Sequence, residues 1–239
     1  MKSTTLGALL DLLVFRLARV DETGLPKGDR VNIGSAYLTP PGWINLDNSP
    51  SVWLSRHRAA RYLLEKTHFT SASAQERWRP GIVFHDVRHG LPWAEQSLSF
   101  IYTSHLLEHL SRLDGEGLLR ECHRVLKPSG ILRVVVPDLR YYAQKYLDDL
   151  DGCDTDTDRA LSATASERFM EIVGVHNGGA LSARNPHRWM YDERSLADGL
   201  KRVGFVNVAA RRYREGDFPD LDKMDTRPID SLHMEAVKA

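Results

Sequence analysis

The sequence has few cysteines, no net charge and no long apolar run. Only Cys122 and Cys153 occur in 239 residues, with no CxxC pair. Neither a disulfide framework nor a thiolate zinc site is indicated, and both thiols are expected to be reduced, as in the cytoplasm. The 32 basic and 32 acidic side chains cancel. No global field then attracts phosphate backbones, so we expect no nucleic-acid partner.

The first twenty residues are apolar at helical spacing, but they do not form a membrane span. Asp11, Arg16 and Arg19 interrupt the stretch well short of the roughly 20 apolar residues that spanning requires. No signal-peptide cleavage site follows. Residues 1–29 therefore predict an amphipathic helix and a linker, with residues 4–20 packed on the domain, on another protein or on a membrane surface. Packing on the protein is favoured. The apolar face comprises Leu6, Leu9, Leu10, Leu13, Leu17 and Val20.

Strands and helices alternate from about residue 30. Strands are predicted at 31–34, 43–47, 82–84, 98–103 and 131–136, and helices at 52–66 and 106–125. This alternation is typical of a parallel sheet covered on both faces. Helices at 139–150, 159–173 and 192–203 follow, then a strand at 205–209 and a last strand at 231–237, expected to be antiparallel to its neighbour. The prediction is one doubly wound α/β domain spanning 30–239.

Residues directly after three of these strands indicate a ligand site, because ligands of open parallel sheets lie outside the carboxyl ends of the strands. Gly34 lets the backbone approach a ligand and offer N–H groups, although GxGxxG is absent. Asp47 can accept hydrogen bonds from both hydroxyls of a ribose. The Asp86 carboxylate, or neighbouring Val87, can read an adenine amino group. Each is equally a turn residue when taken alone, but together they favour an adenosine site.

Several short motifs follow one another along residues 30–140. They are Asn-Ile-Gly34-Ser, Pro-Gly-Trp-Ile-Asn-Leu-Asp47, Gly90-Leu-Pro-Trp, Ser104-His-Leu-Leu-Glu-His109, Arg124-Val-Leu-Lys-Pro-Ser-Gly130 and Val-Val-Pro137-Asp-Leu. This ordered set resembles the class I S-adenosylmethionine-dependent methyltransferases. It is most similar to the methyltransferase type 11-like, small bacterial branch associated with glycan assembly. The resemblance implies a Rossmann-like fold, S-adenosyl-L-methionine as cofactor and methyl transfer as the reaction.

The same resemblance implies which residues hold the cofactor: Gly34 and Ser35 at the methionine part, Asp47 at the ribose, Asp86 and Val87 at the adenine, and Ser104 and His105 at the reacting end. Asn48, directly after Asp47, is a further predicted cofactor contact. Three features depart from the family pattern. Ser99 replaces an aspartate that is common in the fourth strand, and the other two lie in the first loop. Ala36 stands where a second glycine is usual, and the loop to residue 43 leaves little room for a first helix. A methyltransferase-fold binding or assembly protein without activity therefore remains an alternative.

His105 is the candidate general base, because an imidazole titrates near neutral pH and His105 follows the fourth predicted strand. Orienting the loop is an equal alternative for this residue. His105, Glu108 and His109 also match the H-x-x-E-H pattern of inverted zinc proteases. A zinc hydrolase is the weaker alternative, since a third ligand would have to come from elsewhere. No metal is expected.

Residues 150–190 are predicted to form a cover on the substrate side of the domain. The expected contacts with the methyl acceptor are His176, Asn177, His187, Arg188 and Tyr191. Methyl transfer by direct displacement needs mainly alignment and, for a hydroxyl, removal of a proton. The expected activity is therefore O-methylation of a sugar, a glycan or another small polar metabolite.

Overall fold

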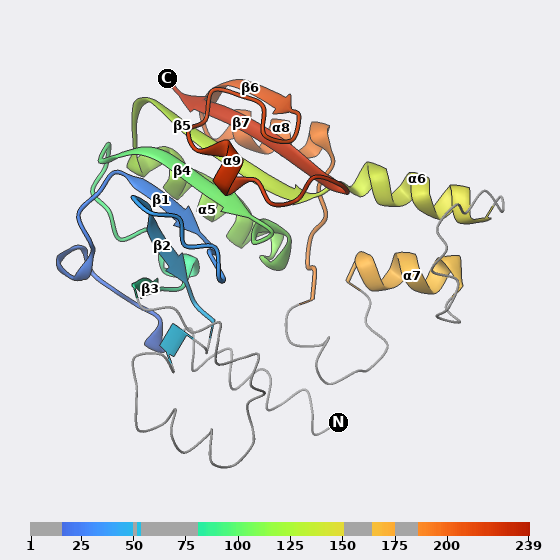
Figure 1. Ribbon diagram of the computed structural model, residues 1–239, viewed down its shortest axis with the longest axis horizontal. Helices are drawn as coiled ribbons and strands as arrows, with labels where there is room; N and C mark the ends of the chain where they lie inside the picture. Colours follow the sequence, from blue (N-terminus) through green and yellow to red (C-terminus); the bar gives the residue numbers. More distant parts are fainter. Residues whose placement is uncertain (1–15, 50–51, 54–80, 151–163, 175–185) are drawn as a thin grey trace, which may run out of the picture.

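The computed structural model describes residues 16–49, 52–53, 81–150, 164–174 and 186–239. Its strands form one sheet in the order β3-β2-β1-β4-β5-β7-β6 (Figure 1). β1 to β5 run parallel, whereas β7 is antiparallel to both β5 and β6. The predicted mostly parallel sheet with an antiparallel last strand is thereby confirmed. The strands are β1 Arg30–Ile33, β2 Ile44–Asp47, β3 Ile82–Phe84, β4 Leu98–Ser104, β5 Leu126–Pro137, β6 Phe205–Arg211 and β7 Ser231–Lys238.

Helices cover both faces of this sheet, as predicted. The α-helices are α5 Arg112–Val125, α6 Leu139–Leu150, α7 Ala165–Ile172, α8 Glu193–Arg202 and α9 Leu221–Met224, and the 3-10 helices are η1 Glu22–Gly24, η2 Val87–His89 and η3 Leu107–His109. Successive side chains of a strand point to opposite faces. Ile101 accordingly belongs to the larger core cluster, with residues of α5 and α8. The next residue, Tyr102, packs in the smaller cluster with Leu221 and Met224 of α9.

No helix lies between β1 and β2, whose connecting residues 34–43 are all described. The loop begins at Gly34, where φ is 69°, and a side chain at this position would meet Leu106 at 3.0 Å. Only glycine fits this turn without strain. The Asn32 side chain donates to Leu38 O and to Asn45 Oδ1, which ties the loop to the sheet. The small space expected for a first helix is thus confirmed.

Two predicted elements differ from the structure, and one observed element was not predicted. The helix expected at 106–125 is divided into η3 and α5, because Ser111 caps α5 by accepting a hydrogen bond from Asp114 N at 3.2 Å. The strand expected at 131–136 begins earlier, since Leu126 already pairs with Leu98. The short helix α9 was not predicted. The helix expected at 52–66 lies outside the described residues except for 52–53.

α6 and α7 lie beyond the carboxyl ends of the parallel strands (Figure 1). They pack against each other through an ion pair between Arg168 and Asp149 at 2.7 Å. The rings of Tyr146 and Phe169 also pack, with centroids 5.1 Å apart. These helices occupy the described part of the predicted 150–190 cover and the segment before it.

The segment before β1 packs along the outer edge of β3. Ala18 O accepts a hydrogen bond from Asp86 N at 2.7 Å, and the fully buried Ala18 packs with Ile82 and Phe84. Leu17, which was expected on the apolar face, is half exposed. Residues 1–15 of the predicted amphipathic helix lie outside the described residues. Among the helices that the structure describes, none is long and apolar enough to cross a membrane.

Candidate functional site

The parallel strands bring the predicted site residues to one edge of the sheet. Ile33 is in register with Leu46 of β2 and with Thr103 of β4, and Asp47 is in register with Phe84 of β3. The residues that follow these positions, including Gly34, Asp86 and Ser104, therefore lie at neighbouring strand ends.

Asp47 is held by two backbone N–H groups. Its Oδ2 accepts from Ala36 N at 2.8 Å and its Oδ1 accepts from Ser49 N at 2.7 Å. Each carboxylate oxygen has a second lone pair, and Asp47 is only partly buried, so both oxygens can also accept a hydroxyl. Ala36, which replaces the usual second glycine, adopts a left-handed φ of 46° and so delivers its N–H group to Asp47.

The first loop offers fewer donors than the sequence suggested. The N–H groups of Gly34 and Ser35 both donate to Leu46 O, at 2.8 and 3.0 Å. The donation to a ligand that was expected from these N–H groups is therefore replaced by bonds within the sheet. The Ser35 hydroxyl is buried and has no hydrogen-bond partner among the described residues. A buried hydroxyl of this kind needs a partner, so Ser35 fits a role in ligand binding.

The Asp86 carboxylate is fully engaged inside the protein. It accepts hydrogen bonds from Arg88 N, Nε and Nη2 and from Asn48 Nδ2, at 2.6–3.0 Å. Burial acts to raise the pKa of Asp86, but the bonds from Arg88 and Asn48 outweigh it and hold this pKa below its usual range. Asp86 caps η2, and the predicted contact of its carboxylate with adenine stays a prediction. Val87 is the first residue of η2, and its contact with the adenine stays a prediction.

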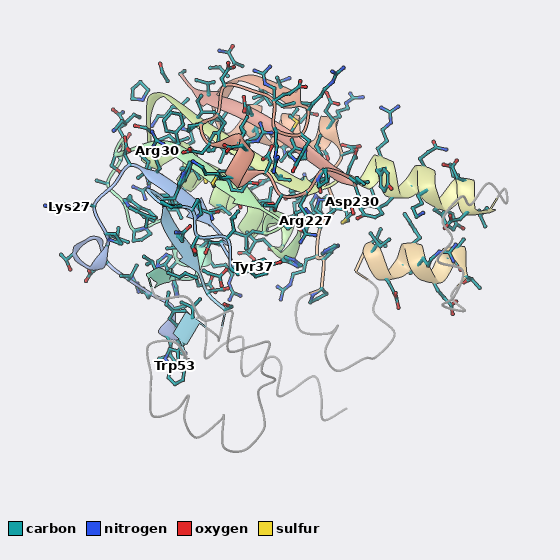
Figure 2. The ribbon with its side chains drawn as sticks, viewed as in Figure 1. Lys27, Arg30, Tyr37, Trp53, Arg227 and Asp230 are labelled. Carbon is teal, nitrogen blue, oxygen red and sulfur yellow. The ribbon has the colours of Figure 1, made fainter. Side chains whose placement is uncertain are left out.

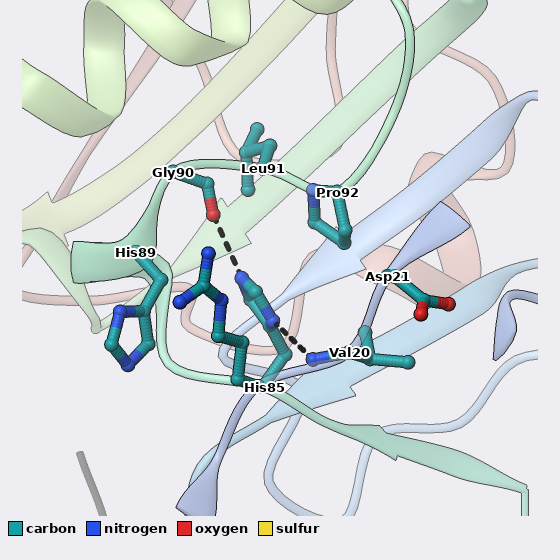
Figure 3. Close-up of a pocket in the computed structure, with 8 residues that line it drawn as sticks. Val20, Asp21, His85, His89, Gly90, Leu91 and Pro92 are labelled. Carbon is teal, nitrogen blue, oxygen red and sulfur yellow. Dashed lines mark hydrogen bonds between the residues drawn. The ribbon is translucent and has the colours of Figure 1, made fainter. Parts of the chain in front are cut away.

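A cavity of about 420 Å³ lies at the edge of the sheet near β3 (Figure 3). His85 stands in its wall, where Nδ1 accepts from Val20 N at 3.2 Å and Nε2–H donates to Gly90 O at 2.7 Å. These bonds define a neutral imidazole, and burial lowers the pKa of His85. None of the predicted site residues lines this cavity. Its lining comprises Arg19, Val20, Asp21, His85, His89, Gly90, Leu91 and Pro92.

His105 adopts a left-handed backbone conformation with φ of 51°, which is uncommon outside glycine and often marks a functional position. Its Nε2 lies 3.0 Å from Ser231 Oγ, and its Nδ1 lies 3.3 Å from Glu108 Oε1. Ser231 donates in turn to Asp230, which also accepts from Tyr142 of α6. Asp230 is labelled in Figure 2. A hydrogen bond to Ser231 thus holds Nε2 of His105, whereas Nδ1 faces the Glu108 carboxylate without a hydrogen bond.

Sequence reasoning did not find Ser231 and Asp230. Ser231 begins the last strand and lies 126 positions from His105, so no local pattern connects the two residues. Only the antiparallel insertion of β7 beside β5 brings them together.

Glu108 and His109 are grouped with His187. One ligand-capable atom of each lies within 4.8 Å of the others, the only such group among the described residues. Glu108 is fully buried, and neither carboxylate oxygen has a hydrogen-bond partner in the described chain. His109 Nδ1 donates to Pro186 O at 3.3 Å, and His187 Nδ1 donates to Ile172 O at 2.6 Å. Burial lowers the pKa of His109.

The residues predicted to contact the methyl acceptor lie in different surroundings. His187 lies beside η3, and the Arg188 side chain is exposed while its N–H donates to Glu108 O at 2.7 Å. Tyr191 is packed in the main core, close enough to Gly115 that a side chain there would meet its hydroxyl at 2.9 Å. Burial raises the pKa of Tyr191 to about 12. The expected acceptor contact of Tyr191 stays a prediction. His176 and Asn177 lie outside the described residues.

Comparison with known proteins places this architecture in a family. A family profile described as a methyltransferase domain matches residues 46–210, whereas no curated protein matches the sequence significantly. One similar solved structure is an S-adenosylmethionine-dependent methyltransferase from Thermotoga maritima. It is 15% identical, the match covers 99% of this chain and 98% of the other, and the TM-score is 0.46. Another, from Archaeoglobus fulgidus, is 15% identical, with 95% of this chain and 94% of the other covered and a TM-score of 0.47. These likenesses concern the fold.

The sheet order and the profile match together define a class I S-adenosylmethionine-dependent methyltransferase. The chain belongs to the methyltransferase-domain family, and its cofactor is S-adenosyl-L-methionine. Asp47, with a lone pair left on each oxygen, and Ser35, with its unpartnered buried hydroxyl, fit such a cofactor at this edge of the sheet.

Proposed function

We propose that the protein is an O-methyltransferase for a sugar, a glycan or another small polar metabolite. The observation that carries this proposal is the His105 ring just after β4, whose Nε2 is hydrogen-bonded to Ser231 and whose Nδ1 lies 3.3 Å from Glu108 Oε1. This position is two strands away from Asp47 on the same edge of the sheet. Bound S-adenosylmethionine supplies an electrophilic methyl group, which passes to the acceptor oxygen while the sulfonium becomes a thioether.

The chain's own residues have separate tasks in this proposal. Asp47, followed by Asn48, accepts the ribose hydroxyls, and Ser35 donates its hydroxyl to the methionine part, with Gly34 allowing close approach. Val87 borders the adenine, and Ser104 lies at the reacting end. His105 receives the proton of the acceptor hydroxyl at a ring nitrogen, a form of general base catalysis. Asp86, whose carboxylate is held by Arg88, borders the adenine beside Val87.

The acceptor side and the surroundings are proposed from the sequence pattern. Residues 150–190 form the substrate-side cover, in which His187 and Arg188 reach the acceptor, and residues 30–239 form the methyltransferase domain. Residues 4–20 contact the domain, a partner protein or a membrane surface. The protein works in the cytoplasm, a placement supported by Cys122, which is a free and buried thiol.

Calorimetry with S-adenosylhomocysteine tests the cofactor site. Asp47→Ala removes the acceptor of two hydroxyl hydrogen bonds, each worth about 1.5–3 kcal/mol when one partner is charged. We expect at least a tenfold weaker Kd, since about 1.4 kcal/mol corresponds to tenfold. Asp217→Ala is the control, because the Asp217 side chain is largely exposed and far from the strand ends. Unchanged binding by Asp47→Ala would contradict the proposal.

Labelled cofactor supplied with sugar, glycan and small polar acceptors tests the activity. His105→Asn preserves the left-handed backbone, which asparagine tolerates, and removes the base. We expect kcat to fall by about 10²–10⁴, with a changed pH profile and little change in cofactor affinity. Cofactor binding without methylation of any acceptor would instead favour the binding or assembly protein.

A further inference from the structure

Glu108 has a buried carboxylate that lacks, among the described residues, the donors that would normally stabilise its charge. Its carboxylate is fully buried, and neither oxygen accepts a hydrogen bond from the described residues. The nearest nitrogen atoms are His105 Nδ1 at 3.3 Å and His109 Nε2 at 3.9 Å. A buried carboxylate normally requires several donors or a cation.

The two neighbouring histidines are held in one particular tautomer. A carbonyl oxygen can only accept, so the Nδ1 atoms of His109 and His187 must carry the protons that they donate to Pro186 O and Ile172 O. The lone pair of each neutral ring is therefore on Nε2. Histidine ligands of metals almost always donate their other ring N–H in this way, often to a backbone carbonyl.

The remaining lone pairs converge. His109 Nε2 points a lone pair toward the buried carboxylate rather than a proton, and the ring centroid of His187 lies 5.0 Å from that of His109. The three ligand atoms lie within 4.8 Å of one another. Ligands about 2.1 Å from a tetrahedral zinc ion lie roughly 3.4 Å apart, so small side-chain rotations suffice to close the site.

We propose that Glu108, His109 and His187 form a binding site for a divalent transition-metal ion of the zinc type. Two histidines and one carboxylate are the ligand set of several zinc sites that keep a fourth position open. The site also joins two regions, because His109 belongs to η3 and His187 to the segment that crosses it. It differs from the pair of His105 and His109 that the H-x-x-E-H pattern suggested.

The open fourth coordination position of the ion can bind the hydroxyl of the methyl acceptor. This role of the ion rests on the proposed function. A hydroxyl bound to a divalent ion loses its proton more readily. The acceptor hydroxyl passes its proton to His105, as in the proposed function, and its oxygen forms the bond to the methyl carbon as the carbon–sulfur bond breaks toward sulfur. Acceptors would then be compounds whose hydroxyl oxygen binds a divalent ion.

Calorimetry with ZnCl₂ tests the site on the full-length protein after EDTA treatment and desalting. We expect one ion per chain, and a tetrahedral absorption spectrum when Co²⁺ is used instead. Glu108→Gln and His187→Ala should each lower Zn²⁺ affinity at least about hundredfold, since even losing an outer-shell partner costs 10–100-fold. His123→Gln is the control, because His123 contacts Phe205 and lies outside the cluster, and it should keep the wild-type affinity.

Absence of Zn²⁺ binding by the wild-type protein, or wild-type affinity in Glu108→Gln, would overturn the proposal. Circular dichroism checks that each variant is folded, and Glu108→Gln decides the question if His187→Ala is not, because it keeps the shape of the side chain. Methyl transfer is measured separately. Zn²⁺ binding without methylation of any acceptor contradicts the proposed function alone, whereas full methylation by metal-free protein contradicts the role of the ion.

Discussion

Two buried carboxylates stand at the same edge of the sheet, and their surroundings differ sharply. Asp86, after β3, accepts four hydrogen bonds from Arg88 and Asn48. Glu108, in η3 after β4, accepts none from the described residues. Asp86 is therefore complete within the protein, whereas Glu108 needs a cation or a proton from outside. The buried carboxylate with four hydrogen bonds thus has a structural role here, whereas the buried carboxylate without hydrogen bonds in the described chain is the candidate for binding a ligand.

Breaking the Asp86 region should have the largest effect. Arg88→Met leaves a carboxylate that is 1% exposed without its cation, and breaking a buried pair costs about 3–5 kcal/mol. Urea unfolding measures this loss. Arg120→Met is the control, because the exposed Arg120–Glu116 pair should be worth at most about 1 kcal/mol. Equal losses in the two variants would mean that Asp86 is not stabilised as described.

Substitution of Glu108 should raise the stability of the protein, whereas substitution of Arg88 should lower it. In EDTA, Glu108→Gln removes an unsatisfied buried charge, and we expect the free energy of unfolding to rise by about 1–3 kcal/mol. Glu235→Gln is the matched control, since Glu235 is also buried but pairs with Arg133 at 2.7 Å and should lose stability. The comparison fails if both variants are destabilised in urea unfolding.

Protonation of His85, in the wall of the cavity, should have a smaller effect on stability than the two substitutions above. Burial depresses the pKa of His85 below 6.5 in the folded state, so its stabilising effect is present above pH 6.5 and is lost as the pH falls through the folded pKa. One such group changes stability by at most about 1.4 kcal/mol per pH unit. Stability measured from pH 7.5 to 5 should fall less steeply in His85→Gln than in the wild type. Parallel curves would refute this assignment.

The sequence predicts the strand ends well and their chemistry only partly. Gly34 and Asp47 are recognisable because a turn and a strand end are local features. The ligand contact of Asp86 stays a prediction, whereas its bonds with Arg88 two residues later come from the structure. The burial of Glu108 could not be predicted, because it depends on a distant segment whose Arg188 and Trp189 N–H groups bind Glu108 O.

The place of β7 in the sheet has a consequence for the order of folding. β7 is made last among the strands, yet it lies between β5 and β6, and β6 pairs only with β7 in the described sheet. During synthesis on the ribosome, β1 to β5 can pair as they emerge, whereas β6 must wait for residues 231–238. The same strand brings Ser231 to His105. The sheet and the candidate base are therefore completed together, only after residues 231–238 have been translated.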